Sequence, residues 1–219
     1  MPQQEPTTTP RRARLSAADR KASILEAATT VFAEVGYRRG RTAEIAARVG
    51  VSEPVVFQNF GSKAVLYAAV LDRVADWVGT GLREELDTCC GGSVATLLDH
   101  VLAPGHIDRM HARGNLGALL ADAAALAEEP LIAEAYGRCT RRLADELTAL
   151  LAQGQLAGEI APGLDPAAGA WWLLSFVASH RFRGTALPEE SRTELENGIA
   201  QLTRRMLTDG AGHGTPSGS

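Results

Sequence analysis

The sequence lacks the long apolar runs and signal segments of membrane and secreted proteins. Its longest uncharged apolar stretch, 167–179, has 13 residues, whereas a helix needs roughly 20 to span a bilayer. Arg11, Arg12 and Arg14 near the start precede no apolar segment of the kind that a signal peptide contains. We therefore expect a cytoplasmic protein with no membrane partner.

Cysteine is also scarce, with only Cys89, Cys90 and Cys139 among 219 residues. Their number is odd, and their spacing matches neither a zinc site nor a redox motif. Reduced thiols are therefore expected.

Enzyme motifs are missing as well. The sequence has no Gly-rich phosphate loop after a strand and no nucleophile elbow. His100, His106 and His111 include no pair four residues apart, which disfavours a metal site. We predict a protein that is not an enzyme and needs no metal or cofactor; a catalytic site assembled from distant residues is the alternative.

What the sequence does contain is apolar residues at helical spacing, without a convincing alternating strand pattern. A hydrophobic content of 45% is enough for a compact core. We predict an all-α fold with an N-terminal three-helix domain and a C-terminal helical domain. The expected divisions are a disordered arm over 1–15, the first domain over 16–63, the second over 64–208 and a disordered tail over 209–219.

Capping residues and glycines set the expected helix boundaries. Ser16 and Asp19 form a capping box that opens the first helix, and Gly36 ends it. Further helices are predicted over 66–86, 97–102, 107–111, 116–126, 132–151, 166–183 and 195–206.

The most informative segment is 42–63, which contains two short helices joined by a tight turn. Gly50 suits the left-handed backbone that ends the first helix, and Ser52 followed by Pro54 suits the start of the second. Ser62 then caps a longer helix. This arrangement indicates a helix-turn-helix, which presents its second helix to DNA.

The same region, roughly 20–70, resembles the DNA-binding region of TetR-type (TetR/AcrR) transcriptional regulators. The residues that carry the resemblance are Phe32, Gly36, Tyr37, Thr42, Ile45, Ala46, Gly50, Val51, Ser52, Phe57, Phe60, Ser62, Lys63 and Leu66. The resemblance implies an all-helical ligand-binding body and a homodimer. The chain departs from the family pattern at Arg41, Pro54 and Phe57, and Phe57 keeps a ring without a phenolic donor.

Positions within the resembling motif imply two kinds of DNA contact. Hydroxyl, amide and ammonium donors suit phosphate groups, and carboxylate, amide and apolar groups suit base edges. The phosphate candidates are Thr42, Ser52, Gln58 and Lys63, and the other DNA-binding candidates are Glu53, Pro54, Val55, Phe57 and Asn59. The alternative roles are helix capping for Thr42, Ser52 and Ser62, core packing for Val55, and a solvated tail rather than a minor-groove arm for the three early arginines.

Charge is divided unevenly along the chain. Residues 1–63 hold 10 Lys and Arg against 6 Asp and Glu, a net +4, whereas the remainder holds 12 against 20, a net −8. Either charge simply varies along the surface, or the basic end meets DNA while the acidic body is repelled by it.

The segment 167–179 is apolar or small on every side, so a helix there needs a cover all round. The cover is either its own subunit alone or its own subunit on one side and a second copy on the other. Family members pair their last two long helices across a two-fold axis, and two reading helices would then match half-sites about 34–36 Å apart in a near-palindromic operator. The interface candidates are Trp171, Leu174, Ser175, Leu195, Ile199, Leu202 and Met206.

The resemblance also implies a small-molecule effector that binds among the central helices. Aromatic, histidine and apolar side chains there are candidates for contact with it, although such residues at helical spacing more often belong simply to the core. These candidates are Trp77, His100, Met110, Leu119, Tyr136, Trp171 and Phe176. The sequence thus predicts a repressor that an effector releases from double-stranded operator DNA; the alternatives are a ligand-independent DNA-binding regulator and an enzyme with an unrecognised site.

Overall fold

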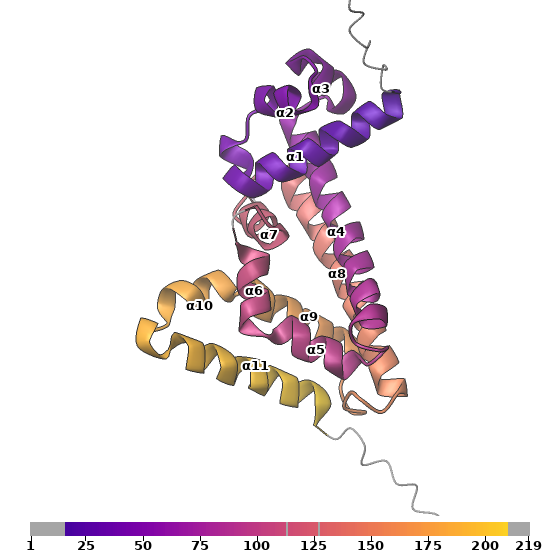
Figure 1. Ribbon diagram of the computed structural model, residues 1–219, viewed down its shortest axis with the longest axis vertical. Coiled ribbons are helices and arrows are strands. Elements are labelled where there is room, and N and C mark those ends of the chain that lie inside the picture. The colour runs from indigo at the N-terminus through magenta and orange to yellow at the C-terminus, as the bar shows by residue number, and fades with distance from the viewer. Residues whose placement is uncertain (1–15, 113, 127, 210–219) are drawn as a thin grey trace, which may run out of the picture.

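A computed structural model describes residues 16–112, 114–126 and 128–209 of the chain. The regular elements within these ranges are all helical, which confirms the predicted fold class (Figure 1). They are α1 (Ala17–Arg39), α2 (Thr42–Val49), α3 (Glu53–Phe60), α4 (Lys63–Thr88), α5 (Val94–Leu102), α6 (Pro104–His111), α7 (Leu116–Ala124), α8 (Pro130–Leu156), α9 (Pro166–Ala178), α10 (His180–Ala186), the 3-10 turn η1 (Glu189–Ser191) and α11 (Arg192–Thr208). The predicted arm over 1–15, with its arginines, lies outside these residues, as does the tail after 209.

Ser16, Gly36 and Gly50 determine where α1 and α2 begin, break or end. Ser16 Oγ accepts a hydrogen bond from the Asp19 N–H at 3.0 Å and so caps α1. The helix breaks at Gly36, where φ is +77°, and makes one further turn to Arg39. Gly50 ends α2 in the left-handed conformation (φ +77°, ψ 34°), as the glycine in the turn predicts.

The two longest helices, α4 and α8, run side by side in the same direction (Figure 1). Ion pairs link them along their length in matching order: Asp72 with Arg138, Asp76 with Arg142 and Arg83 with Glu146. Exposed pairs of this kind contribute at most about 1 kcal/mol each. They therefore fix the alignment of the two helices more than their stability.

Two clusters of buried side chains form the interior. The upper core joins α1–α4 to α7 and the first half of α8, and the lower core joins the end of α4 to α5, α6, the second half of α8, α9 and α11. Leu66 and Leu71 on α4 contribute to the upper core, and Leu86 contributes to the lower. The helices that would read DNA thus share their interior with the body of the molecule.

The helix predicted over 166–183 is broken, which the sequence pattern did not indicate. α9 ends at Ala178, and α10 begins at His180. The carbonyl of Phe176 accepts hydrogen bonds from two side chains, Ser179 Oγ at 3.0 Å and Arg183 Nη1 at 2.7 Å. These side-chain donors satisfy the end of α9 and allow the chain to turn. None of the described helices is long and apolar enough to span a membrane.

Candidate nucleic-acid interface

α3 lies at one end of the molecule, beside α2 and away from the body (Figure 1). Val56 and Phe60 are buried beneath it, whereas Pro54, Phe57 and Gln58 are exposed. One face of an eight-residue helix is thus anchored in the upper core and the other is open to solvent. This is the arrangement that a recognition helix needs.

Thr42 joins the two helices of the turn rather than facing outward. It is buried, and its hydroxyl donates a hydrogen bond to the carboxylate of Glu53. A hydroxyl has one proton to donate. A phosphate contact through this proton would therefore require the bond to Glu53 to break.

Lys63 is half-buried against the end of α1. Its Nζ donates to the carbonyl of Arg38 at 3.3 Å and lies 4.7 Å from the centroid of the Tyr37 ring. Burial lowers the pKa of Lys63, and the nearby carboxylate of Asp122 opposes that shift. In this arrangement Lys63 closes the C-terminal end of α1.

Among the remaining candidates, Val55 and Asn59 are half-buried, whereas Ser52 is exposed. Asn59 Nδ2 donates to the carbonyl of Val55 at 2.7 Å, and Val55 is half-buried against the upper core. Ser52 has the extended backbone of an N-cap and an exposed side chain, but its hydroxyl makes no capping hydrogen bond. Ser62, by contrast, accepts from the Val65 N–H at 3.2 Å, which confirms its capping role.

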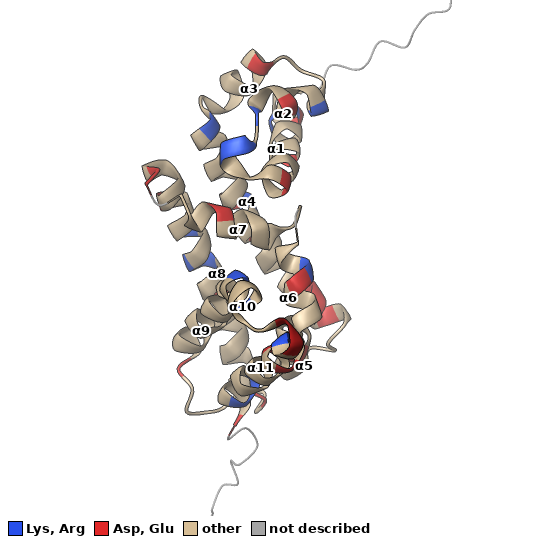
Figure 2. Ribbon diagram, turned by 90° about the vertical axis from the view of Figure 1, so that its left-hand side faces the viewer, with Lys and Arg blue, Asp and Glu red and all other residues tan. Residues whose placement is uncertain are grey.

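An open groove of about 790 Å³ lies where the end of α1 meets the starts of α2, α3 and α4. Four basic residues line it together with two acidic ones, and Figure 2 shows Lys and Arg at the end of the molecule that holds α2 and α3. The basic residues are Arg38, Arg39, Arg41 and Lys63, and the acidic ones are Glu44 and Glu53. Arg38 and Arg39 were not among the residues predicted from the sequence, although the run of arginines before α2 was a signal for them.

Asp122 on α7 contacts α1 and α4, the helices that support α2 and α3. Its Oδ2 accepts a hydrogen bond from the Tyr37 N–H at 2.7 Å and another from the Tyr67 hydroxyl at 2.8 Å. Burial and the adjacent carboxylate raise the pKa of Tyr67, so the phenol stays protonated and donates. One carboxylate thus joins α7 to both α1 and α4.

A small cavity of about 50 Å³ lies between α4, α5, α8 and α9. Its lining is entirely aliphatic: Leu82, Val94, Leu97, Leu98, Val101, Leu147, Leu150, Leu151, Leu173, Leu174 and Val177. The predicted effector contacts are not among these residues. An apolar cavity therefore lies among the central helices, where the effector is predicted to bind, but side chains other than the predicted ones line it.

The predicted effector contacts are scattered over the body. Leu119 is fully buried in the upper core, whereas Phe176 is buried in the lower. Trp77 and Trp171 are exposed, His100 lies 3.0 Å from a carboxylate oxygen of Glu85, and Met110 and Tyr136 are half-buried. The structure does not bring the seven together, so their common role stays a prediction.

The predicted interface residues leave apolar surface on the single chain. Trp171 on α9 is 47% exposed, and Leu202 on α11 is 66% exposed. Leu195, Met206 and Ser175 are also exposed, whereas Leu174 and Ile199 are half-buried. Phe182 on α10, which was not predicted from the sequence, is also exposed.

A short helix anchored by α2, exposed on its outer face and flanked by a basic groove defines a helix-turn-helix DNA-binding transcriptional regulator. Residues 24–70 match the family model described as bacterial regulatory proteins, tetR family. Over 162 residues the chain is 30% identical to the HTH-type transcriptional regulator RutR of Escherichia coli strain K12, an alignment that covers 73% of this chain and 72% of RutR. The chain belongs to the tetR family.

Two further likenesses are partial or distant. The HTH-type transcriptional activator FasR of Mycolicibacterium smegmatis is 45% identical over 75 residues, so this chain spans only 34% of its length. A crystal structure of a TetR-family transcriptional regulator from Agrobacterium tumefaciens aligns with a TM-score of 0.66 at 18% identity, over 87% of this chain and 98% of that one. The family and these relatives are transcriptional regulators rather than enzymes.

Proposed function

We propose that the protein is a homodimeric repressor that a small-molecule effector releases from a near-palindromic operator. The observation that carries the proposal is the contact of Asp122 with Tyr37 and Tyr67. It connects α7 of the body to α1 and α4, the two helices that support α2 and α3. A location in the cytoplasm, where the operator lies, follows from this function.

The dimer is proposed from the apolar surface of α9 and α11. Large apolar side chains at 40–66% exposure on these helices favour burial against a second copy. A two-fold arrangement through Trp171, Leu174, Ser175, Leu195, Ile199, Leu202 and Met206 would place two copies of α3 on one face of the duplex.

The DNA contacts are proposed at two levels. Ser52, Gln58, Lys63 and the arginines of the groove supply donors to phosphates, which fix position. Glu53, Pro54, Val55, Phe57 and Asn59 supply the face that meets base edges, which fixes sequence. Because Thr42 donates to Glu53, we assign it to base-edge recognition, where it orients the Glu53 carboxylate, and not to phosphate binding.

The effector is proposed to enter between α4, α5, α8 and α9. Drug-sized ligands occupy pockets of roughly 300–1,000 Å³, so the aliphatic cavity of about 50 Å³ must enlarge on binding. Enlargement would displace α4, which lines the cavity through Leu82 and carries Tyr67, and would thereby strain the Asp122 junction. This gives the effector different affinities for the two states, as any allosteric ligand requires.

The test is to select bound duplexes from a random pool, and then to measure the affinity of the full-length protein for the selected site by fluorescence anisotropy. We expect a near-palindrome, a dimer by light scattering, and a metabolite fraction that lowers the affinity at least tenfold. A monomer bound to a single half-site would contradict the dimeric repressor. An operator complex that no metabolite weakens would identify a ligand-independent regulator.

A further inference from the structure

Arg183 on α10 carries an unused buried donor. It is only 7% exposed, and among the described residues its Nη2 is the buried side-chain polar atom without a hydrogen-bond partner. Nε donates to both carboxylate oxygens of Glu196, at 3.0 and 2.9 Å, and Nη1 donates to Phe176 O and Ser179 Oγ. A buried donor left unpaired is costly, and most so on a charged group. Such an atom in a native fold calls for an acceptor.

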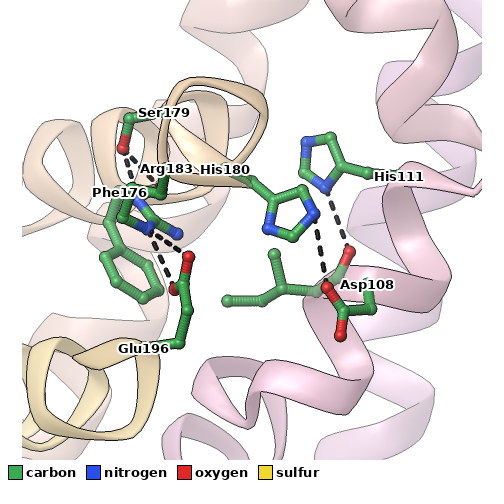
Figure 3. Close-up of polar contacts among 8 residues, drawn as sticks. Asp108, His111, Phe176, Ser179, His180, Arg183 and Glu196 are labelled. Atoms are coloured by element: carbon green, nitrogen blue, oxygen red, sulfur yellow. Dashed lines mark hydrogen bonds and ion pairs between the residues drawn. The ribbon is translucent and has the colours of Figure 1, made fainter. Parts of the chain in front are cut away.

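Two histidines lie on the side to which Nη2 points. Figure 3 shows the Arg183 nitrogen directed away from α9 toward His180, with His111 beyond it on α6. The centroids of the two imidazole rings are 4.7 Å apart. His111 Nδ1 is 3.1 Å from the carbonyl of Ile107, so in the neutral ring Nδ1 donates and Nε2 carries the lone pair, and His180 Nε2 lies 3.4 Å from Asp108 Oδ1.

The charged groups around this space are of both signs, because Asp108 and Glu196 lie beside His180 and Arg183. Burial lowers the pKa of His111, the hydrogen bond to the Ile107 carbonyl opposes that shift, and the neighbouring charges of His180, Arg183 and Arg181 lower the pKa further. The charged groups that shift His111 are thus all cationic. Glu196 faces Arg183 from α11, but it is held on the Nε side of the guanidinium.

We propose that Arg183 Nη2, together with His111 and His180, binds the carboxylate of a small organic acid and forms the polar end of the effector site. This inference rests on the proposed ligand-responsive function and names its ligand class. The guanidinium of Arg183 suits a carboxylate, His111 can donate to it through Nε2 when the ring is protonated, which a bound anion favours, and Glu196 already balances the charge of Arg183. A singly charged acid therefore fits this site better than a doubly charged phosphate.

The cluster borders on solvent at the contact between Asp108 of α6 and His180 of α10. Asp108 is 69% exposed at its side chain, and it holds His180 only by the contact of 3.4 Å. A ligand carboxylate can take over His180 from Asp108 as it approaches Nη2. The Phe176 ring, 4.4 Å from the Arg183 guanidinium carbon, belongs to the lower core together with Leu98 and Leu173, which line the aliphatic cavity.

The position of the site connects it to the reading helices. His111 is the last residue of α6, and the Gly114 N–H shortly after it donates to the Ala33 carbonyl of α1 at 3.1 Å. A carboxylate that ties α6 to α10 therefore acts close to the contact between the body and α1. The Asp122 junction on α7 follows directly along the chain.

The test measures binding to the full-length protein without DNA, so that its failure is distinguishable from failure of operator release. The probes are benzoate and butyrate, their neutral amides benzamide and butyramide, and inorganic phosphate. A carboxylate at several times its Kd should raise Tm by roughly 2–4 °C in a chain of this size, and the matching amide should not. Titration calorimetry would give the Kd of each probe that shifts Tm.

Two variants locate the site. Arg183→Met combined with Glu196→Met removes the donor without leaving a buried charge, and should abolish the shift. His111→Phe keeps the buried ion pair and should raise the carboxylate Kd several-fold. Arg204→Met, which breaks the exposed pair with Asp99 on α11, is the matched control and should bind as the parent does.

Three results would overturn the proposal. They are equal shifts by an acid and its amide, a carboxylate shift that persists in both variants, and no shift with either acid. A larger shift with phosphate than with the acids would overturn the assigned ligand class.

Discussion

The Oδ2 atom of Asp122 lies 2.7 Å from the backbone nitrogen of Tyr37, so a side chain of the body caps the turn that follows the Gly36 break in α1. A Cβ at Gly36 would lie 2.8 Å from the other carboxylate oxygen. Glycine is therefore favoured at position 36 by both the positive φ and the close approach of Asp122. This contact is where a change in the body reaches the DNA-reading end.

Asp122→Ala should destabilise the protein and uncouple its two ends. It removes the acceptor of the Tyr37 N–H, at about 1–3 kcal/mol, and the shorter of two contacts of the Tyr67 hydroxyl, which keeps the Leu119 carbonyl at 3.2 Å. Urea unfolding should show the loss in the free energy of unfolding. Tyr67→Phe, which removes the hydroxyl but keeps the bond from the Tyr37 N–H to Asp122, should lose less; an equal loss in both variants would contradict the dual role of Asp122.

Thr42→Val should relax sequence specificity and leave the salt dependence of DNA binding unchanged. Valine keeps the shape of threonine but cannot orient the Glu53 carboxylate. One well-placed base contact is worth about 1–3 kcal/mol of discrimination. Selection of bound duplexes should show weaker preference at one position in each half-site.

The control for Thr42 is Thr29→Val on α1, whose hydroxyl donates to the Leu25 carbonyl within the same helix. It should leave the selected site intact. A shallower salt slope for Thr42→Val, with an unchanged selected site, would instead restore Thr42 to phosphate binding.

Arg39→Ala should weaken DNA binding almost equally for all sequences. Arg39 lines the basic groove, and removal of one phosphate contact reduces the slope of log K against log salt by about 0.9. Anisotropy titrations at several salt concentrations measure that slope. Arg205→Ala on α11, at the far end of the molecule, is the matched control; equal slopes for the two variants would remove the groove from the interface.

Leu202→Arg should convert the proposed dimer to a monomer. Leu202 is 66% exposed on α11, so the change costs the single chain little but places a charge in an apolar interface. Light scattering should report half the mass, and operator affinity should fall at least a hundredfold. Leu156→Arg, at a residue 93% exposed at the end of α8, should change neither quantity.

Stability should fall at high pH in a way that depends on Cys139. Burial raises the pKa of its thiol from 9.0 to about 11. The folded state therefore holds this proton more tightly than the unfolded state does, so the contribution is complete below pH 9 and is lost as the pH rises to 11. Urea unfolding across that range should show a steeper decline than in Cys139→Ala; parallel declines would contradict the shift.

The parts of the fold that follow from local sequence were predictable. Ser16, Gly36, Gly50 and Ser62 each act through backbone within a few residues, and the structure places them as their types predict. The break after α9 was not predictable in this way. It depends on Arg183, beyond the end of α9, whose side chain folds back to the Phe176 carbonyl.

The candidate site was predictable as a segment but not as a set of roles. Thr42 and Glu53 are 11 residues apart, on separate helices, and their pairing depends on how α2 crosses α3. Lys63 reaches the Arg38 carbonyl across an even longer separation. Effector contacts chosen by residue type were scattered because aromatic side chains occur in both cores and on the surface.

The upper core also limits how this regulator can be re-engineered. One buried cluster joins α1 and α2 to α7, and it contains Val31, Phe32, Ile45, Leu119 and Ala123. A graft of residues 16–63 onto the body of another regulator would expose that surface and lose its partners. A working chimera would also need the face of α7 that packs against residues 16–63.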